Sequence, residues 1–208
     1  MLKQTPRATP RIKSDRVSFD RAAANAILDE APICHVGFVV KGAPMVIPTI
    51  HWRIGDRLFF HGSRGSRLAA GQDLCVTVTL VDGLVLARSA FHHSMNYRSV
   101  ILFGQAGEIV DDGEKTAAFD ALMDKMTPGR RAHVRPPSDK ERSATKLLSL
   151  AIDEGSVKIR RGPPVDAEDD MAWPVWAGVL PLALTQGRPI TDERSLPGIT
   201  AGKPGTAE

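Results

Sequence analysis

The sequence predicts a mainly β protein with flanking helices, in which an antiparallel sheet closes into a barrel. Two observations favour this class: β-rich segments follow one another through short turns, and strands do not alternate regularly with helices. Strands are expected in six segments between residues 33 and 110: 33–40, 45–54, 57–60, 74–81, 84–91 and 99–110. Turn residues separate them, such as Gly55-Asp56 before the third.

Helical patterns flank the strands. Ser18 or Asp20 can cap a first helix that runs to about Glu30. An apolar stripe at helical spacing predicts a second helix that ends near Pro128, and it consists of Phe119, Leu122, Met123 and Met126. Ser138 and Glu141 have the spacing of a capping box, which predicts a third helix up to about Ile152. Residues 156–161 are expected to form a further strand.

Composition limits the classes of protein and partner. With 208 residues, 42% of them hydrophobic, the chain can bury one good core. No apolar run has the length of a membrane span, and the N-terminus lacks the apolar stretch of a secretory signal. A net charge of +3 without a basic-aromatic motif does not favour nucleic acid. Cys34 and Cys75 are isolated in apolar segments, which favours two core thiols in a reducing cytoplasm.

The chain divides into three parts. Residues 1–16 are expected to be a disordered basic arm, whose cations are Lys3, Arg7, Arg11, Lys13 and Arg16. Residues 17–184 are expected to form the folded domain. The Pro/Gly-rich residues 185–208 are expected to be a flexible tail.

The run from His61 to Leu68 is the most informative feature, because its residue types suit a phosphate. It offers close backbone approach at Gly62 and Gly65, hydroxyls at Ser63 and Ser66, and guanidinium groups at Arg64 and Arg67. Residues 68–70 are helix-compatible, so a short helical turn with free N–H groups is expected there. An ordinary surface loop fits the same composition.

Four segments together carry a family resemblance: Pro44–Thr49, Leu58–Ser63, Tyr97–Gly104 and Val175–Val179. In their order and spacing the chain resembles the pyridoxamine 5'-phosphate oxidase-like flavin-binding proteins. It is most similar to their branch related to 5-nitroimidazole reductases and flavin-nucleotide-binding proteins. The resemblance spans about residues 16–182. It implies an FMN-binding split β-barrel that is homodimeric, with one FMN at each end of the dimer interface.

The resemblance also implies which residues hold the cofactor. Ser63, Ser66 and Arg67 match phosphate-binding positions, and Pro48 and Thr49 match the strand along the isoalloxazine edge. Trp176 matches a late aromatic residue that approaches the flavin from the other subunit. The oxidase itself has a second basic residue where this chain has Leu68. The complete implied set is Pro48, Thr49, His61, Gly62, Ser63, Ser66, Arg67, Tyr97, Arg98, Ser99, Val100 and Trp176.

Several of these residues have structural alternatives. Pro48 can mark an edge strand, and Tyr97 and Trp176 can be core residues. His92 and His93 suggest a metal or haem ligand, but no second group of ligands accompanies them, so no metal site is expected. Cys34 and His35 alternate in one strand and point to opposite faces, which argues against joint ligation.

The function expected from these features is an FMN-dependent oxidoreductase that moves two electrons to or from a small organic molecule, such as a nitroaromatic. No nucleophile–base pair or carboxylate dyad stands out, as expected where the cofactor carries the chemistry. Two alternatives stay open: a non-catalytic flavin-binding sensor or store, and a haem- or deazaflavin-binding relative of the same fold. Oxidation of pyridoxamine phosphate is disfavoured, because residues 177–184 lack the arginine and histidine of its substrate clamp.

Overall fold

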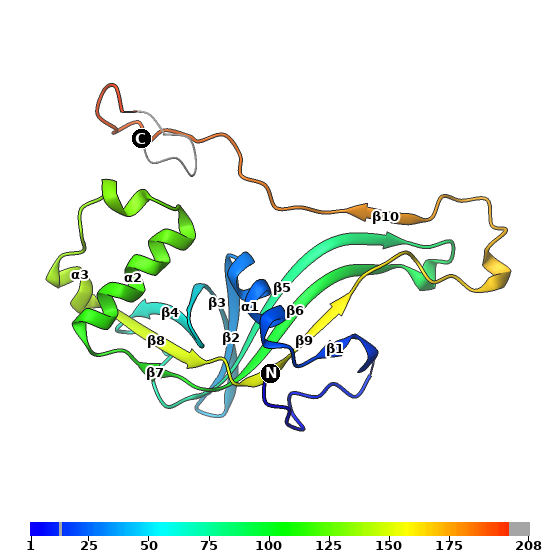
Figure 1. Ribbon diagram of the computed structural model, residues 1–208, viewed down its shortest axis with the longest axis horizontal. Coiled ribbons are helices and arrows are strands. Elements are labelled where there is room, and N and C mark those ends of the chain that lie inside the picture. Colours follow the sequence, from blue (N-terminus) through cyan, green and yellow to red (C-terminus); the bar gives the residue numbers. More distant parts are fainter. Residues whose placement is uncertain (13, 200–208) are drawn as a thin grey trace.

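The computed structural model describes residues 1–12 and 14–199. Within them the fold is built on one antiparallel sheet whose strands differ in length (Figure 1). The order of its strands is β1-β9-β6-β5-β2-β3-β4-β8-β7, and β10 pairs with β5. The strands are β1 (Val17–Ser18), β2 (Ile33–Val40), β3 (Ala43–Ile54), β4 (Arg57–Ser63), β5 (Asp73–Leu86), β6 (Ser94–Gln105), β7 (Gly107–Glu108), β8 (Thr145–Ala151), β9 (Glu154–Arg160) and β10 (Gly178–Pro181).

The two ends of this sheet are not paired with each other in the described chain, so the barrel is open. The predicted class, a mainly β split barrel with flanking helices, is confirmed. The helices are α1 (Arg21–Glu30), α2 (Asp112–Met126) and α3 (Asp139–Ala144), with short 3-10 turns η1 (Ser14–Arg16), η2 (Ala90–His92), η3 (Arg130–His133) and η4 (Glu168–Asp170). None of these helices is long and apolar enough to cross a membrane.

Helix α1 closes one side of the barrel. Of the two candidate caps, Asp20 is the one that the structure uses, since its carboxylate accepts the N–H groups of Ala22 and Ala23. Ile27 and Leu28 are fully buried in the main core, between α1 and the inner face of the sheet. A second, smaller core lies under α2 around Trp52, Phe59, Ile109, Ala118, Leu122 and Leu147.

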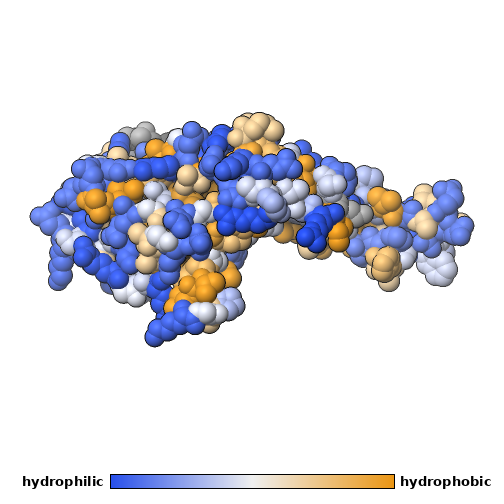
Figure 2. Space-filling model, turned by 90° about the horizontal axis from the view of Figure 1, so that it is seen from below, coloured by the Kyte–Doolittle hydropathy of each residue, from blue (hydrophilic) through white to orange (hydrophobic). Residues whose placement is uncertain are grey.

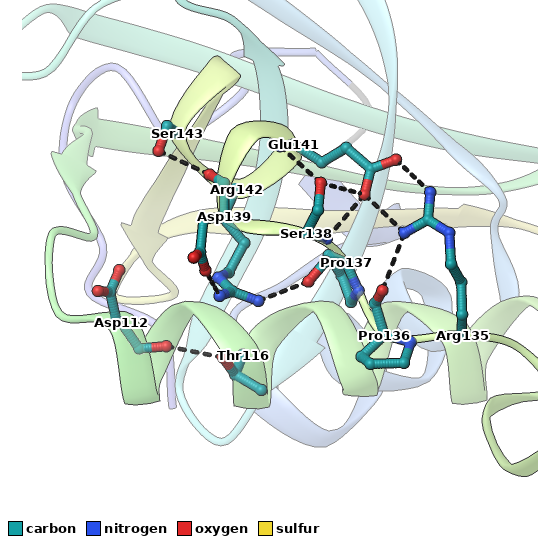
Figure 3. A network of polar contacts seen from close by, with 10 residues as sticks. All are labelled: Asp112, Thr116, Arg135, Pro136, Pro137, Ser138, Asp139, Glu141, Arg142 and Ser143. Atoms are coloured by element: carbon teal, nitrogen blue, oxygen red, sulfur yellow. Dashed lines mark hydrogen bonds and ion pairs between the residues drawn. The ribbon is translucent and has the colours of Figure 1, made fainter.

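The predicted third helix is wrong over most of its length. The capping box of Ser138 and Glu141 is present, with Ser138 N–H donating to Glu141 Oε2 at 2.7 Å, and Arg135 braces the same carboxylate (Figure 3). However, α3 ends at Ala144 and the chain continues as β8. All four residues of Leu147–Leu150 are buried, because β8 lies between both cores. Such an apolar run fits a helix or a doubly buried strand equally well.

The predicted strand 74–81 and residues 84–86 of the predicted strand 84–91 form one strand, β5, with a register shift between Val81 and Gly83. The prediction is wrong for residues 87–91, which lie outside β5 and lead into the 3-10 turn η2. β6 begins at Ser94 and ends at Gln105, so the predicted segment 99–110 is displaced. The outer parts of β5 and β6 form a projecting wing together with β10 (Figure 1). Gly83 permits this addition, because a Cβ there would lie 3.0 Å from Leu180 O.

The N-terminal arm is packed, which differs from the expected disorder. Leu2 is buried, and its N–H donates to Phe19 O at 2.6 Å. Arg7 forms an ion pair with Glu154 at 2.6 Å and lies over the ring of Phe103. These partners come from β9 and β6, so local composition does not reveal them. Lys13 and residues 200–208 of the predicted tail lie outside the described residues.

The two cysteines differ in burial. Cys34 is fully buried, as predicted, and burial raises the pKa of its thiol to about 12. Cys75 is only half-buried, on the outer face of β5.

Candidate functional site

The candidate site begins where β3 and β4 separate. The two strands pair from Ile54 and Arg57 to His51 and Phe60 and no further. Beyond this point residues 48–50 of β3 pair with β2 and with no other described strand, whereas residues 61–63 of β4 pair with β8. We call these two stretches the banks of the β3–β4 split. The structure therefore places five predicted residues at the split: Pro48, Thr49, His61, Gly62 and Ser63.

Pro48 lies on the bank formed by β3, where β3 is paired with β2 on one side and no longer with β4 on the other. β3 is therefore an edge strand at this position. Proline has no N–H to donate, which makes an edge position suitable for it. The edge-strand interpretation of Pro48 and its proposed place beside a cofactor are therefore compatible. On the other bank, His61 is half-buried, and burial lowers the pKa of its imidazole. Its ring lies 6.1 Å from that of Trp52 and 6.4 Å from that of Phe119.

The loop Ser63–Leu68, which we call the anion loop, closes one end of the split. Ser66 N–H donates to Ser63 O at 2.9 Å, and the Ser66 hydroxyl accepts from Leu68 N–H at 3.2 Å. Gly62 allows this fold-back, because a Cβ at its position would lie 3.3 Å from Ser66 Cβ. The expected helical turn at 68–70 is absent. Ala69 N–H instead donates to the side chain of Gln72, at 2.8 Å.

Three cations surround the anion loop, and none of them forms an ion pair in the part of the chain that the structure describes: Arg64, Arg67 and Lys146. Arg64 donates from Nε to Ser143 O. Arg67 is exposed, and its nearest polar contact is Met45 Sδ at 3.6 Å from Nη1. Uncompensated charges around a glycine-containing turn suit a phosphate group.

Lys146 is a site residue that sequence reasoning missed. It lies opposite Gly62 in the β4–β8 register, and its Nζ donates to Leu68 O at 3.3 Å. No signal in the sequence around Lys146 points to this place, because the segment was expected to be helical. Only the pairing of β8 with β4 brings it to the loop.

Although β5 and β2 lie between β6 and β3, Arg98 lines one cavity together with Pro48 of the split. The other predicted residues of β6, Tyr97, Ser99 and Val100, do not line that cavity. The Arg98 guanidinium is held by Asp82 and Glu30, with Nη2 at 2.7 Å from an oxygen of each. These hydrogen bonds raise the pKa of Arg98 and lower those of both carboxyls. Ser99 donates to Lys158 O at 3.2 Å, and Val100 is buried in the main core.

Trp176 lies on the wing, just before β10, and its side chain is exposed, with 64% of the residue accessible. Its indole covers Gly178, where an added Cβ would lie 2.7 Å from Trp176 Cζ2. The core interpretation of Trp176 therefore does not hold within this chain. Tyr97 is half-buried on β6. No group of three or more potential metal ligands is found among the described residues.

Comparison with solved structures gives two similar chains of nearly full length. The flavocytochrome Anf3 from Azotobacter vinelandii is 41% identical over 96% of this chain and 94% of its own, with a TM-score of 0.90. The FAD and haem binding protein from Mycobacterium smegmatis is 40% identical over 90% of this chain and 94% of its own, with a TM-score of 0.85. A candidate 5-nitroimidazole antibiotic resistance protein from Bacteroides thetaiotaomicron is 25% identical over 68% of this chain and 86% of its own, with a TM-score of 0.55.

No curated protein matches by sequence. The family model of pyridoxamine 5'-phosphate oxidase matches residues 20–159, which contain the split, the anion loop and β6. This range covers most of the chain and contains every predicted cofactor-binding residue except Trp176. The chain therefore belongs to the pyridoxamine 5'-phosphate oxidase family, with the flavin- and haem-binding split-barrel proteins among its structural relatives.

Proposed function

We propose that this protein is a flavin-dependent redox protein that holds its flavin nucleotide at the β3–β4 split. The observation that carries the proposal is the anion loop, where Arg67, Arg64 and Lys146 surround a tight turn and have no carboxylate partner among residues 1–12 and 14–199. FMN and FAD both carry phosphate, and charge-assisted hydrogen bonds from arginine and lysine suit it. FMN is the flavin that the sequence resemblance implies, and FAD is named for a relative 40% identical.

A bound flavin would supply the electron-transfer chemistry, and the chain would supply binding and position. The anion loop holds the phosphate end. The bank of β3 at residues 48–50 has lost its neighbour β4, so backbone groups along that edge are available to the polar edge of a flavin ring. On the opposite bank, burial lowers the pKa of His61, which favours the neutral imidazole beside the ring.

We further propose that the protein also binds haem. Support comes from the two similar chains, one a flavocytochrome and the other an FAD and haem binding protein, which match nearly the whole chain at 40–41% identity. Their likeness extends beyond the family's matched range to the wing and the arm, because 96% of this chain is covered by the first. A flavin and a haem in one protein would pass electrons between two-electron and one-electron partners.

We propose that the active form is a homodimer in the cytoplasm. Two features support the dimer. Tyr97, Ser99 and Trp176 do not line the cavity that Arg98 shares with Pro48 of the split, so a partner is needed to bring them to a flavin. The outer sheet face also exposes apolar side chains at Ile33, Val39 and Val46. The cytoplasm is supported by two free cysteines.

The test is the visible spectrum of the purified protein after incubation with FMN, FAD and hemin. We expect flavin bands and a Soret band, with mass spectrometry of the released flavin distinguishing FMN from FAD. Stopped-flow mixing with NADH or NADPH, with and without a nitroaromatic acceptor, then separates an enzyme from a flavin store. A protein that takes up no flavin under these conditions contradicts the proposal.

A further inference from the structure

The outer face of the sheet carries a trough of two neighbouring cavities that meet at one histidine. The first has a volume of about 450 Å³ and lies over β2, β3, β5 and β6. The second has a volume of about 650 Å³ and lies over the stretch of β5 between its pairings with β2 and β10. His35 lines both cavities, and no other histidine lines either of them.

The walls of the trough suit a flat apolar ligand. Val39, Val46 and Phe103 line the first cavity, which is mainly apolar. Ile33, Val81 and Leu182 line the second, which is more polar because Glu30, Asp82 and Arg98 line it too. Gly37 lies two residues from His35 on the same face of β2 and lines the first cavity. It has no side chain to fill the cavity, and an added Cβ would lie 3.3 Å from Cys75 O. Cofactor sites in proteins are typically about 300–1,000 Å³ and mainly apolar.

Each cavity also has an arginine in its wall. Arg7 lines the first, with its guanidinium 4.9 Å from the centre of the Phe103 ring. Arg98 lines the second, where Asp82 and Glu30 fix its position. Both guanidinium groups are already paired with carboxylates, Arg7 with Glu154 and Arg98 with Asp82 and Glu30. The features of the trough that suit a planar macrocycle are therefore its apolar walls and the imidazole of His35.

The other histidines are less suited to bind a haem iron. His51 is fully buried, and its Nε2 donates to Leu28 O at 2.9 Å. His61 lies at the flavin split between Trp52 and Phe119. The remaining three line neither cavity: His92 and His93 are at the tip of the wing, and His133 is in η3.

We propose that the trough is the haem site and that an imidazole nitrogen of His35 is an axial ligand of the iron. This inference rests on the proposed function, because it assigns a place to the haem. The imidazole of His35 would supply a nitrogen lone pair to the iron in place of a water ligand, which is released to solvent. Pro48 is the cross-strand neighbour of His35 and also forms a bank of the split. The two cofactors would therefore lie beside the same part of β3, a short path for electrons.

The experiment is a hemin titration of haem-depleted protein, followed by absorption and EPR spectroscopy. Wild type is compared with His35→Ala and with the matched control His93→Ala, which removes an exposed histidine outside the trough. We expect His35→Ala to bind hemin at least tenfold more weakly and to show a different spin state, as removal of a metal ligand generally does. Added imidazole should restore the wild-type spectrum. His93→Ala should match wild type.

A conservative variant separates ligation from packing. His35→Met keeps a long side chain with a different donor atom, so a ligand at this position must change the Soret band. The proposal is overturned if both His35 variants keep the wild-type spectrum and affinity, or if His93→Ala is the variant that loses haem. Flavin content, measured in the same samples, should stay unchanged. A wild type that binds flavin but no hemin overturns this inference and the haem part of the proposed function, and leaves the flavin part standing.

Discussion

His51 and Phe60 form the last cross-strand pair of β3 and β4 before the two strands separate. His51 turns inward to donate to Leu28 O, and Phe60 is fully buried in the main core. This buried pair fixes the end of the split at which β3 and β4 are still hydrogen-bonded to each other, so both banks begin at a well-packed position. Residues that approach the split from β3 and from the anion loop are thereby held in a defined relation.

Arg67→Ala is expected to weaken the binding of FMN much more than that of riboflavin. Arg67 is exposed at the anion loop and has no ion-pair partner in the described part of the chain, and riboflavin lacks the phosphate. The loss of one charge-assisted hydrogen bond costs about 1.5–3 kcal/mol, which is roughly tenfold to a hundredfold in affinity. Flavin fluorescence quenching measures both ligands. Arg64→Ala is the control with a smaller expected loss, since Arg64 already donates to Ser143 O. Equal losses of the two ligands in Arg67→Ala would place it away from the phosphate.

Wild type is expected to sediment at twice the 22.5 kDa of the chain, and Val46→Glu is expected to shift it toward monomer. Val46 is 65% exposed on the outer sheet face, where a carboxylate would be desolvated by a second copy. Because Val46 also lines the first cavity of the trough, the comparison is made with haem-free protein. The matched control is Val110→Glu, which changes a residue that is 76% exposed and lies after β7. Sedimentation equilibrium at micromolar concentration decides. A wild type that is monomeric throughout would refute the proposed dimer.

Trp176→Leu is expected to increase the fluorescence of bound flavin and leave the dimer intact. An exposed indole on the wing can stack on a planar ring from a partner chain. Trp173→Leu is the matched control, because Trp173 is also exposed on the same segment. Steady-state flavin emission and the reduction rate are measured together. If emission is the same in wild type and in Trp176→Leu, Trp176 is not beside the flavin.

The free energy of unfolding is expected to fall as pH decreases from about 6.5 to 4, because of His51. Burial, followed by the charge of Lys125, lowers the pKa of His51 to about 4 from 6.5. The unfolded chain therefore takes up a proton at higher pH than the folded chain, so stability is complete above 6.5 and decreases below it. The shift corresponds to about 3 kcal/mol. Urea unfolding at pH 7 and pH 4 should show a smaller decrease in His51→Gln than in wild type. His133→Gln, at an exposed position, should behave as wild type.

The contact between the arm and β9 is expected to weaken in acid. The hydrogen bond from Arg7, followed by that from Thr5, lowers the pKa of Glu154 to about 2 from 4.5. The contribution of ionised Glu154 is complete above pH 4.5 and is lost as pH falls through about 2. The difference in Tm between wild type and Glu154→Gln should therefore be largest at pH 7 and shrink toward pH 2. Glu108→Gln, an exposed control, should show no such trend. A constant difference would mean that the ion pair does not hold the arm.

Much of the fold follows from local sequence. β2 and β9 form close to the segments where their residue patterns predict strands. Asp20 caps the start of α1, and α2 ends before Pro128, as their local sequences predict. The chemistry of the anion loop also follows from its residue types, because glycine, serine and arginine have the same donors in any fold. These features depend on neighbours within a few residues, where propensity and capping act.

The tertiary structure alone decided the rest. Leu147–Leu150 became a strand because β4 offered a partner and two cores covered both of its faces. The same pairing brought Lys146 beside Gly62, and Glu154 ordered an arm that its composition alone would leave disordered. In the same way, the split, the trough at His35 and the separation of Trp176 from the anion loop depend on which strands are neighbours. Strand neighbours are chosen by burial and hydrogen bonding between segments far apart in sequence, so no local pattern contains them.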